Sequence, residues 1–547
     1  MTVSDEVLNS LTMKYCLKYL PLLFIACALS PSLLAATHTV DLTMRYETVI
    51  LGEKPVRAIT VNGQIPAPEL RFTEGDDLII NLHNELDEPG SIHWHGLLVP
   101  YKMDGVPWVS MPPVMPGETF QYRFTLQQSG TYWYHSHSKF HEQRGLYGAF
   151  IVEPKKEPLA YDREMTLMLS DWADRDPDET YRNLKKDGDY YKQFHPSWKF
   201  FWDEYRKADE AEKKQIRETI AHMQQMRMGV WDWGDVAYDA FLLNGKTPNQ
   251  PWTQQVVQGE TVRLRIINGG ASSYFNLRID GAEYFTVVAA DGQPVEPIKA
   301  QRLLIGMAET YDILLKIDED KPYYVYAESQ DRTGHAIATL KTRPDQADSA
   351  ELPAFNDPWF AEGHDHHDMA GMDQDHDMAK MDHSQHSGHD MSSMAMTTHV
   401  PEAVIKLDYN HLRATYESHR QQEPAIDITL HLTGNMERYI WSFDNVRFED
   451  AEPILFEEGK TYKLTLINDT MMHHPIHIHG HWFVMDTGNG NHNPRKHTID
   501  VPPMGKRVAW IKAEANGKWL FHCHNLYHMK AGMTRLINYH NVVEDEE

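Results

Sequence analysis

A segment of eleven residues that occurs three times constrains the fold of this 547-residue chain more than any other feature. Each copy is a short turn centred on glycine, followed by a run in which apolar and polar residues largely alternate and which ends in asparagine. The copies occupy residues 74–84, 258–268 and 458–468. Alternation with a period of two is typical of a half-buried β-strand. The chain is therefore expected to repeat one β-structured unit three times.

Length and the distribution of turn residues agree with this expectation. At roughly 150 residues per domain, a chain of this length predicts three domains. Short β-like runs separated by Gly, Pro and Asp predict an all-β fold of three β-sandwich domains, over residues 37–155, 156–345 and 401–547. Residues 203–227 depart from the pattern, because Ile216 and Ile220 follow helical spacing among charged residues, which predicts a helical insertion in the second domain.

The N-terminal residues 1–36 are typical of a secretion signal. Lys14 and Lys18 precede the apolar run 20–29, and two alanines follow it. No later apolar run is long enough for a membrane-spanning helix, so we expect a mature protein without a stable membrane span. Two of the three cysteines lie in the signal region, which leaves only Cys523. A secreted chain of this size without disulfides is typical of the periplasm.

The charge excludes one class of partner. The formal net charge is -27, so the chain is not expected to bind nucleic acid, and it will tend to concentrate cations near its surface.

Histidines follow the first and third copies of the repeat at the same positions. Nine and eleven residues after Asn84 stand His93 and His95, and the same offsets from Asn468 give His477 and His479. The middle copy has the apolar Leu277 and Ile279 there. A second block behaves alike, with His135-Ser136-His137 five residues after Gly130 and His522-Cys523-His524 five residues after Gly517. Ligands are therefore expected in the first and third domains, with the second domain as a spacer.

The residue types in these motifs indicate copper chemistry. Alternate residues of a strand share a face, so each His-x-His pair can point into one site. One such pair is a weak signal, but four clusters at matched positions of a repeat are hard to obtain by chance. A thiolate, two imidazoles and a weak axial thioether make a blue-copper site. Cys523, His528 and Met533 supply three of these ligands within eleven residues, and His474 is the best candidate for the fourth.

These four motifs resemble those of the multicopper oxidases, the family of laccases and ascorbate oxidase. Residues 131–137, 433–439 and 468–472 further resemble the copper-resistance branch of periplasmic multicopper oxidases. The resemblance implies three cupredoxin-like Greek-key domains and four copper ions, one of type 1, one of type 2 and two of type 3. It also implies the transfer of single electrons from a donor to dioxygen.

The resemblance further implies a role for each candidate ligand. Type 1 copper would be held by His474, Cys523 and His528, with Met533 as the weak axial ligand. Type 2 copper would be held by His93 and His477. One type 3 copper would be held by His95, His135 and His524, and the other by His137, His479 and His522. In the family an acidic residue near the type 2 copper assists proton delivery, which points to Asp104, whereas the plain alternative is a turn aspartate before Gly105.

A low-complexity segment lies within residues 346–400. Residues 361–399 are dominated by His, Met and Asp. Thioether sulfur prefers Cu(I), imidazole suits Cu(II), and carboxylates attract either ion, so this composition favours copper capture by a flexible segment over a plain linker.

Three functions remain open from the sequence. The leading one is an oxidase whose donor is Cu(I), in copper tolerance. A laccase acting on phenols or aromatic amines is the first alternative, since both kinds of donor deliver single electrons. A copper-sequestering protein without turnover is the second, although storage alone would not need twelve ligands. A two-domain copper nitrite reductase is disfavoured by the length of the chain and by the histidines that flank Cys523.

Overall fold

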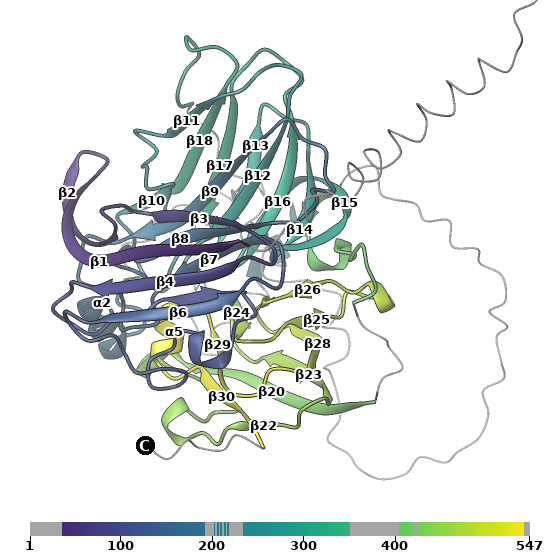
Figure 1. Cartoon of the computed structure of the whole chain (residues 1–547). Helices are drawn as coiled ribbons and strands as arrows, with labels where there is room; N and C mark the ends of the chain where they lie inside the picture. The colour runs from purple at the N-terminus through teal and green to yellow at the C-terminus, as the bar shows by residue number, and fades with distance from the viewer. Residues whose placement is uncertain are drawn as a thin grey trace, which may run out of the picture.

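The structure, a computed structural model, describes residues 36–191, 234–350, 404–418 and 424–540, together with scattered positions between 202 and 217. Its described part consists of five β-sheets arranged in three consecutive units (Figure 1). The predicted signal region, most of the predicted helical insertion over residues 203–227 and the His/Met/Asp-rich segment lie outside the described residues. Within the described ranges no helix is both long enough and apolar enough to cross a membrane.

The N-terminal unit packs two four-stranded sheets, ordered β2-β1-β4-β6 and β3-β8-β7-β5. Its strands are β1 (Thr37–Leu51), β2 (Lys54–Val61), β3 (Ala67–Thr73), β4 (Asp77–Asn84), β5 (His93–His95), β6 (Thr119–Thr125), β7 (Gly130–His135) and β8 (Tyr147–Glu153). The short strand β5 pairs with the end of β7 in register His93↔His135. Two histidine motifs of this unit are therefore neighbours in one sheet.

The middle unit is one eleven-stranded sheet, ordered β10-β9-β12-β16-β14-β15-β13-β17-β18-β11, with β19 paired to β15. Its strands are β9 (Arg163–Trp172), β10 (Ala240–Leu243), β11 (Trp252–Gln255), β12 (Thr261–Asn268), β13 (Phe275–Asp280), β14 (Phe285–Ala290), β15 (Gln293–Ile305), β16 (Thr310–Lys316), β17 (Tyr323–Ser329), β18 (His335–Lys341) and β19 (Val404–Leu407). Helix α2 (Pro177–Lys186) follows β9, and the Asp176 side chain accepts a hydrogen bond from the Asp178 amide at its start.

The C-terminal unit has a six-stranded sheet, β21-β20-β23-β28-β25-β26, and a five-stranded sheet, β22-β30-β29-β24-β27. Its elements are β20 (Ala425–Asn435), β21 (Ile440–Phe443), β22 (Ile454–Phe456), β23 (Thr461–Asn468), β24 (His474–Ile478), β25 (Phe483–Met485), β26 (Arg495–Lys496), β27 (Thr498–Val501), β28 (Lys506–Lys512), β29 (Lys518–Cys523), α5 (Leu526–Lys530) and β30 (Thr534–Tyr539). Strand β24 pairs with β29 in register His477↔His522, which brings the two histidine motifs of this unit together.

The sequence repeat corresponds to strands β4, β12 and β23, which hold the same position in the three units. Each pairs in parallel with the first long strand of its unit, β1, β9 or β20, and antiparallel with β6, β16 or β28. The turn glycine before each strand, Gly75, Gly259 or Gly459, has a positive φ of 95°, 94° or 80°, a conformation that favours glycine. The prediction of an all-β chain built on a repeated strand is confirmed.

The asparagine that ends each repeat shapes the loop after it. Asn84, Asn268 and Asn468 are buried, and each side-chain carbonyl accepts a hydrogen bond of 2.9 Å from the backbone amide two residues later. Each side-chain amide donates to backbone carbonyls across the loop. The three loops thus start alike, whether or not histidines follow. In the middle unit the corresponding Leu277 and Ile279 lie in the apolar core.

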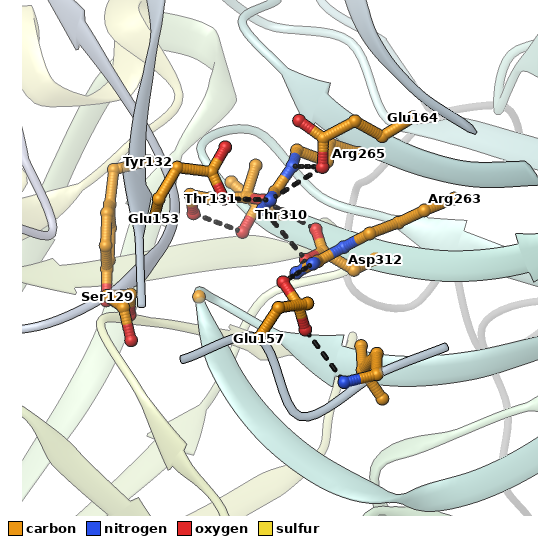
Figure 2. Close-up of polar contacts among 12 residues, drawn as sticks. Ser129, Thr131, Tyr132, Glu153, Glu157, Glu164, Arg263, Arg265, Thr310 and Asp312 are labelled. Atoms are coloured by element: carbon orange, nitrogen blue, oxygen red, sulfur yellow. Dashed lines mark hydrogen bonds and ion pairs between the residues drawn. The ribbon is translucent and has the colours of Figure 1, made fainter. Parts of the chain in front are cut away.

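A buried seam of charged side chains joins the N-terminal unit to the middle unit (Figure 2). Arg265 in β12 is fully buried, and it donates to the Thr131 hydroxyl of β7 at 2.9 Å and to Glu164 at 2.9 Å. Asp312 in β16 pairs with Arg263 at 2.6 Å and accepts from the same Thr131 hydroxyl at 2.6 Å. Because every charge in this seam has an opposite partner, the cost of burying it is offset locally.

We predict that Arg265→Met destabilises the copper-free protein by about 1–3 kcal/mol, because the buried Thr131 hydroxyl and the partly buried Glu164 each lose a charge-assisted hydrogen bond, although Asp312 keeps Arg263 as its partner. Urea denaturation of the copper-free protein measures this loss. Arg163→Met is the matched control, since Arg163 pairs with Glu260 at 3.0 Å but its side chain is 43% exposed, and about 0–1 kcal/mol is expected there. If both variants lost the same free energy of unfolding, the buried seam would contribute no more to stability than an exposed ion pair.

Candidate metal centres

One sulfur and two imidazole nitrogens meet at the end of β29. Sγ of Cys523 lies 3.6 Å from Nδ1 of His474 and 3.8 Å from Nδ1 of His528, and these two nitrogens are 3.1 Å apart. The pairing of β24 with β29 places His474 beside Cys523, and α5 brings His528 back onto the same point. All three residues are fully buried. A thiol and two imidazoles that converge in this way form the donor set of a blue-copper site.

The outer side of each imidazole in this group is held by another side chain. Nε2 of His474 lies 2.8 Å from the Thr470 hydroxyl, and Nε2 of His528 lies 2.8 Å from the Asp235 carboxylate. Met533 is buried next to the group, and its carbonyl accepts from the Cys523 amide at 3.1 Å. Burial raises the pKa of the Cys523 thiol, so a cation beside the sulfur is needed to stabilise the thiolate.

Eight further histidines converge where the N-terminal and C-terminal units meet. Four come from the N-terminal unit and four from β24, β29 and the residues that follow them. Ligand atoms lie within 4.8 Å of one another in three overlapping groups: His93, His95 and His477; His93, His137 and His479; and His95, His135 and His524. His522 adjoins the second group, since its Nε2 lies 3.2 Å from Nε2 of His479. All eight predicted histidines are thereby brought together.

The inward nitrogens of this cluster show that the residues fit a metal centre. Among the described residues, six of the eight histidines carry a buried ring nitrogen without a hydrogen-bond partner: Nε2 of His93, His135, His137, His477 and His524, and Nδ1 of His95. Buried polar atoms are normally paired, because leaving one unpaired costs free energy. Imidazole nitrogen is a ligand for copper, and bound copper ions would pair these atoms. The donor chemistry therefore fits a cluster of coppers.

Outward hydrogen bonds fix which nitrogen faces inward. Nδ1 of His93 donates to the Asp104 carbonyl at 2.7 Å, and Nδ1 of His477 donates to the His497 carbonyl at 2.7 Å. Nδ1 of His522 donates to the Cys523 carbonyl at 2.9 Å. Such outer partners set the tautomer and the orientation of a ligand. His95 is reversed, since its Nε2 faces outward and its Nδ1 has no partner.

Burial favours the neutral form of seven of the eight imidazoles of the cluster. Burial lowers the pKa of His95, His135 and His477 well below the usual histidine value, and the neighbouring imidazoles lower it further. The same cause lowers the pKa of His479 to about 4 and that of His524 to about 3. Only a neutral imidazole has a free lone pair for a metal, so the lowered pKa values favour metal binding by these rings.

Asp104 contacts two histidines of the cluster. Its Oδ2 accepts from Nδ1 of His479 at 2.9 Å, and its Oδ1 lies 3.3 Å from Nδ1 of His93. Burial alone would raise the pKa of this carboxyl, but the two imidazoles outweigh burial and hold it below its usual range. Asp104 also precedes Gly105, whose φ is 86° and where a Cβ would lie 1.8 Å from the Ile92 carbonyl oxygen. The residue thus combines the turn position with contact to the cluster.

Sequence reasoning missed four residues that contact the ligands. The Glu142 carboxylate lies 2.6 Å from Nδ1 of His135, and burial, with Asp171 acting in the same direction, raises its pKa. Asp235 holds His528, as described above. His497 and Thr498 lie behind His95 and His477. None of the four belongs to a repeated motif, so no spacing signal could have identified them.

Comparison with known proteins agrees with this geometry. Three family models, each described as multicopper oxidase, match residues 43–157, 163–345 and 421–541. The chain is 39% identical to copper resistance protein A of Escherichia coli, over 90% of this chain and 91% of that protein. It is 40% identical to a copper resistance protein A homolog of Pseudomonas syringae pv. tomato, with the same coverage.

A solved structure extends the likeness to the fold. The crystal structure of Fet3p, described as a multicopper oxidase that functions in iron import, matches with a TM-score of 0.67 at 22% identity, over 92% of this chain and 90% of that chain. Two converging donor sets, the threefold repeat and these matches lead to one conclusion: the chain belongs to the multicopper oxidase family, whose members are copper-dependent oxidoreductases with four coppers.

Proposed function

We propose that this oxidase takes single electrons from Cu(I) at a type 1 site and passes them to dioxygen, which is reduced to water at a three-copper cluster. The observation that carries the proposal is the presence of both donor sets in one chain, joined by Cys523. Copper bound at these residues supplies one-electron transfer at the first site and multi-electron reduction of dioxygen at the second. A protein that only stored copper would need neither the sulfur site nor the connection.

The proposed ligand assignment follows the family motifs, and two of the four observed groups contain only residues assigned to one copper. His474, Cys523, His528 and Met533 would hold the type 1 copper. The type 2 copper would be held by His93 and His477. The two type 3 coppers would be held by His95, His135 and His524, and by His137, His479 and His522. Support comes from the groups around Cys523 and His135, which contain the expected partners.

The electron path lies in the chain itself. His522 and His524 flank Cys523, so the proposed type 1 ligand is bonded through the backbone to one proposed ligand of each type 3 copper. Strand β29 is paired on both sides at His522, with β24 and β30, and the amides of Cys523 and His524 donate to the carbonyls of Met533 and Pro475. Electron transfer along this path therefore requires no conformational change.

Two features favour Cu(I) as the donor. Two relatives that are 39% and 40% identical over 90% of this chain are copper resistance proteins, whereas a laccase and an ascorbate oxidase match a similar share of the chain at 25% and 27% identity. Residues 361–399 interleave Met, His and Asp, ligands that suit both oxidation states of copper. A phenol-oxidising laccase remains the alternative. We also propose a periplasmic location, which the basic and apolar pattern of residues 1–36 supports.

The donor proposal predicts that the purified copper-loaded enzyme consumes oxygen faster with Cu(I) than with a phenol. Deleting residues 364–396 should weaken Cu(I) oxidation and any activation by added copper, but leave the blue colour and phenol oxidation largely intact. Oxygen-electrode assays with both donors on both proteins measure this. If the deletion protein oxidises Cu(I) with unchanged rate and apparent affinity, the segment does not deliver copper. If phenol is the faster donor, the laccase alternative replaces the proposal.

Cys523→Ser should abolish both the blue colour and the oxidase activity. The colour comes from charge transfer from thiolate to copper, and after loss of the signal region no other cysteine remains. The histidine cluster should still bind its three copper ions, because Cys523 is not one of its proposed ligands. Visible absorption and copper analysis test this, and a blue, active variant contradicts the type 1 assignment.

Asp104→Asn should slow reoxidation of the reduced enzyme by dioxygen while leaving reduction of the type 1 copper nearly unchanged. Asparagine keeps the size and the turn preference of aspartate, but it cannot carry a proton from solvent to the cluster. Stopped-flow absorption follows the two half-reactions separately. Equal reoxidation rates in the two proteins would leave Asp104 with its turn role alone.

A further inference from the structure

The middle unit extends one buried carboxylate into the C-terminal unit, close to the cluster. Asp291 lies between β14 and β15 and is fully buried. Its Oδ2 accepts hydrogen bonds of 3.2 Å from the backbone amides of His497 and Thr498, and Nζ of Lys496 lies 3.1 Å from the same oxygen. One side chain of a unit without predicted ligands thus holds three consecutive residues of a unit with ligands.

Residues 497 and 498 in turn orient two histidines of the cluster. The His497 carbonyl accepts from Nδ1 of His477 at 2.7 Å, which directs Nε2 of His477 inward. Nδ1 of His497 and the Thr498 hydroxyl each lie 3.2 Å from Nε2 of His95. The two imidazoles stack with ring centroids 3.8 Å apart, so a shift of residues 497–498 moves both.

The same carboxylate is tied to the N-terminal unit through one residue. The amide of Asp291 donates to the Thr310 carbonyl at 2.7 Å, and the Thr310 amide donates to Oδ1 of Asp291 at 3.1 Å. The Thr310 hydroxyl then donates to the Thr131 carbonyl of β7 at 3.0 Å, beside the charged seam (Figure 2). Strand β7 ends at His135. A short chain of hydrogen bonds therefore links a ligand strand of one unit to the ligand-orienting segment of the other.

We propose that Asp291 is a positioning residue that sets the spacing between His477 and the ligands of the N-terminal unit. It acts through residues 497–498, and it touches neither a proposed ligand nor a substrate. The proposal rests on the copper assignment made above. It gives the middle unit a task beyond separating the other two, because the cluster's geometry depends on a side chain of that unit.

A purely stabilising role is the rival explanation. Lys496 is fully buried and has a second anionic partner, Glu309, at 2.9 Å. Removing either carboxylate weakens the compensation of the Lys496 charge. Glu309 also accepts hydrogen bonds from the Gly306 amide and from the Tyr409 hydroxyl. Within the described residues, Glu309 makes no hydrogen bond to residues 497–498 or to the cluster. Glu309→Gln is therefore a matched control for Asp291→Asn, with the same loss of charge next to the same lysine.

The experiment compares copper-loaded wild type, Asp291→Asn and Glu309→Gln. Electron paramagnetic resonance reports the type 2 copper, absorption near the blue band reports type 1, and chelator titration gives the affinity for type 2 copper. We expect Asp291→Asn to alter the type 2 signal and to weaken that affinity by up to about 10-fold, the lower end of the effect of losing a direct outer partner of a ligand, because Asp291 acts through residues 497–498. Glu309→Gln should lower the thermal midpoint by a similar amount but leave the type 2 signal unchanged. Both variants should keep the blue band.

Equal type 2 signals and affinities in the two variants would overturn the proposal. If Asp291→Asn does not fold, Asp291→Glu replaces it, since it keeps the negative charge near Lys496 but displaces the oxygen that accepts from the His497 and Thr498 amides. An unchanged type 2 signal and affinity in that variant would overturn the proposal as well. Failure of the copper assignment is distinguishable, because wild type itself would then lack a type 2 signal or bind fewer than four coppers.

Discussion

The cluster depends on one constraint: eight imidazoles from two units must meet, and six of them carry a buried ring nitrogen without a hydrogen-bond partner in the described structure. Neutral rings with free lone pairs are costly in a protein interior, because each forgoes a hydrogen bond that water would provide. The structure offsets this cost on the outer side of the rings, where the Asp104 carbonyl, the His497 carbonyl and Glu142 accept or face the other nitrogen. These outer contacts orient the rings without any contribution from a bound metal.

The same constraint explains why the chain needs three units. Two sheets that each carry histidines can meet at many angles, and nothing in a His-x-His pair selects one. The middle unit contacts both partners with buried charges, through Arg265 and Asp312 on one side and Asp291 on the other. Buried ion pairs are directional and intolerant of sliding, whereas apolar contacts tolerate it. The unit without ligands is therefore suited to fix the relative placement of the other two.

Local repetition made the fold and the proposed ligands predictable from sequence. The turn glycine, the alternating strand and the final asparagine recur in each unit, and the histidines recur at constant offsets from Asn84 and Asn468. The residues behind the ligands could not be predicted, because Glu142, Asp235 and Asp291 reach them through folding and not through spacing. Helix α2 was also missed, although Asp176 and Pro177 form a recognisable helix start. The strand β19 was unexpected, since residues 404–407 join the middle sheet by a pairing over a long sequence distance.

The buried asparagines have a consequence for the order of maturation. Asn268 makes the same loop contacts in the unit without copper ligands as Asn84 and Asn468 make beside the ligands. The loops that present the histidines are therefore held by amide hydrogen bonds that require no ion. Folding can precede metallation, unlike in small zinc domains that are unfolded without their metal. Copper would then bind to sites that are already folded. Metal binding could therefore take place after the chain has left its site of synthesis.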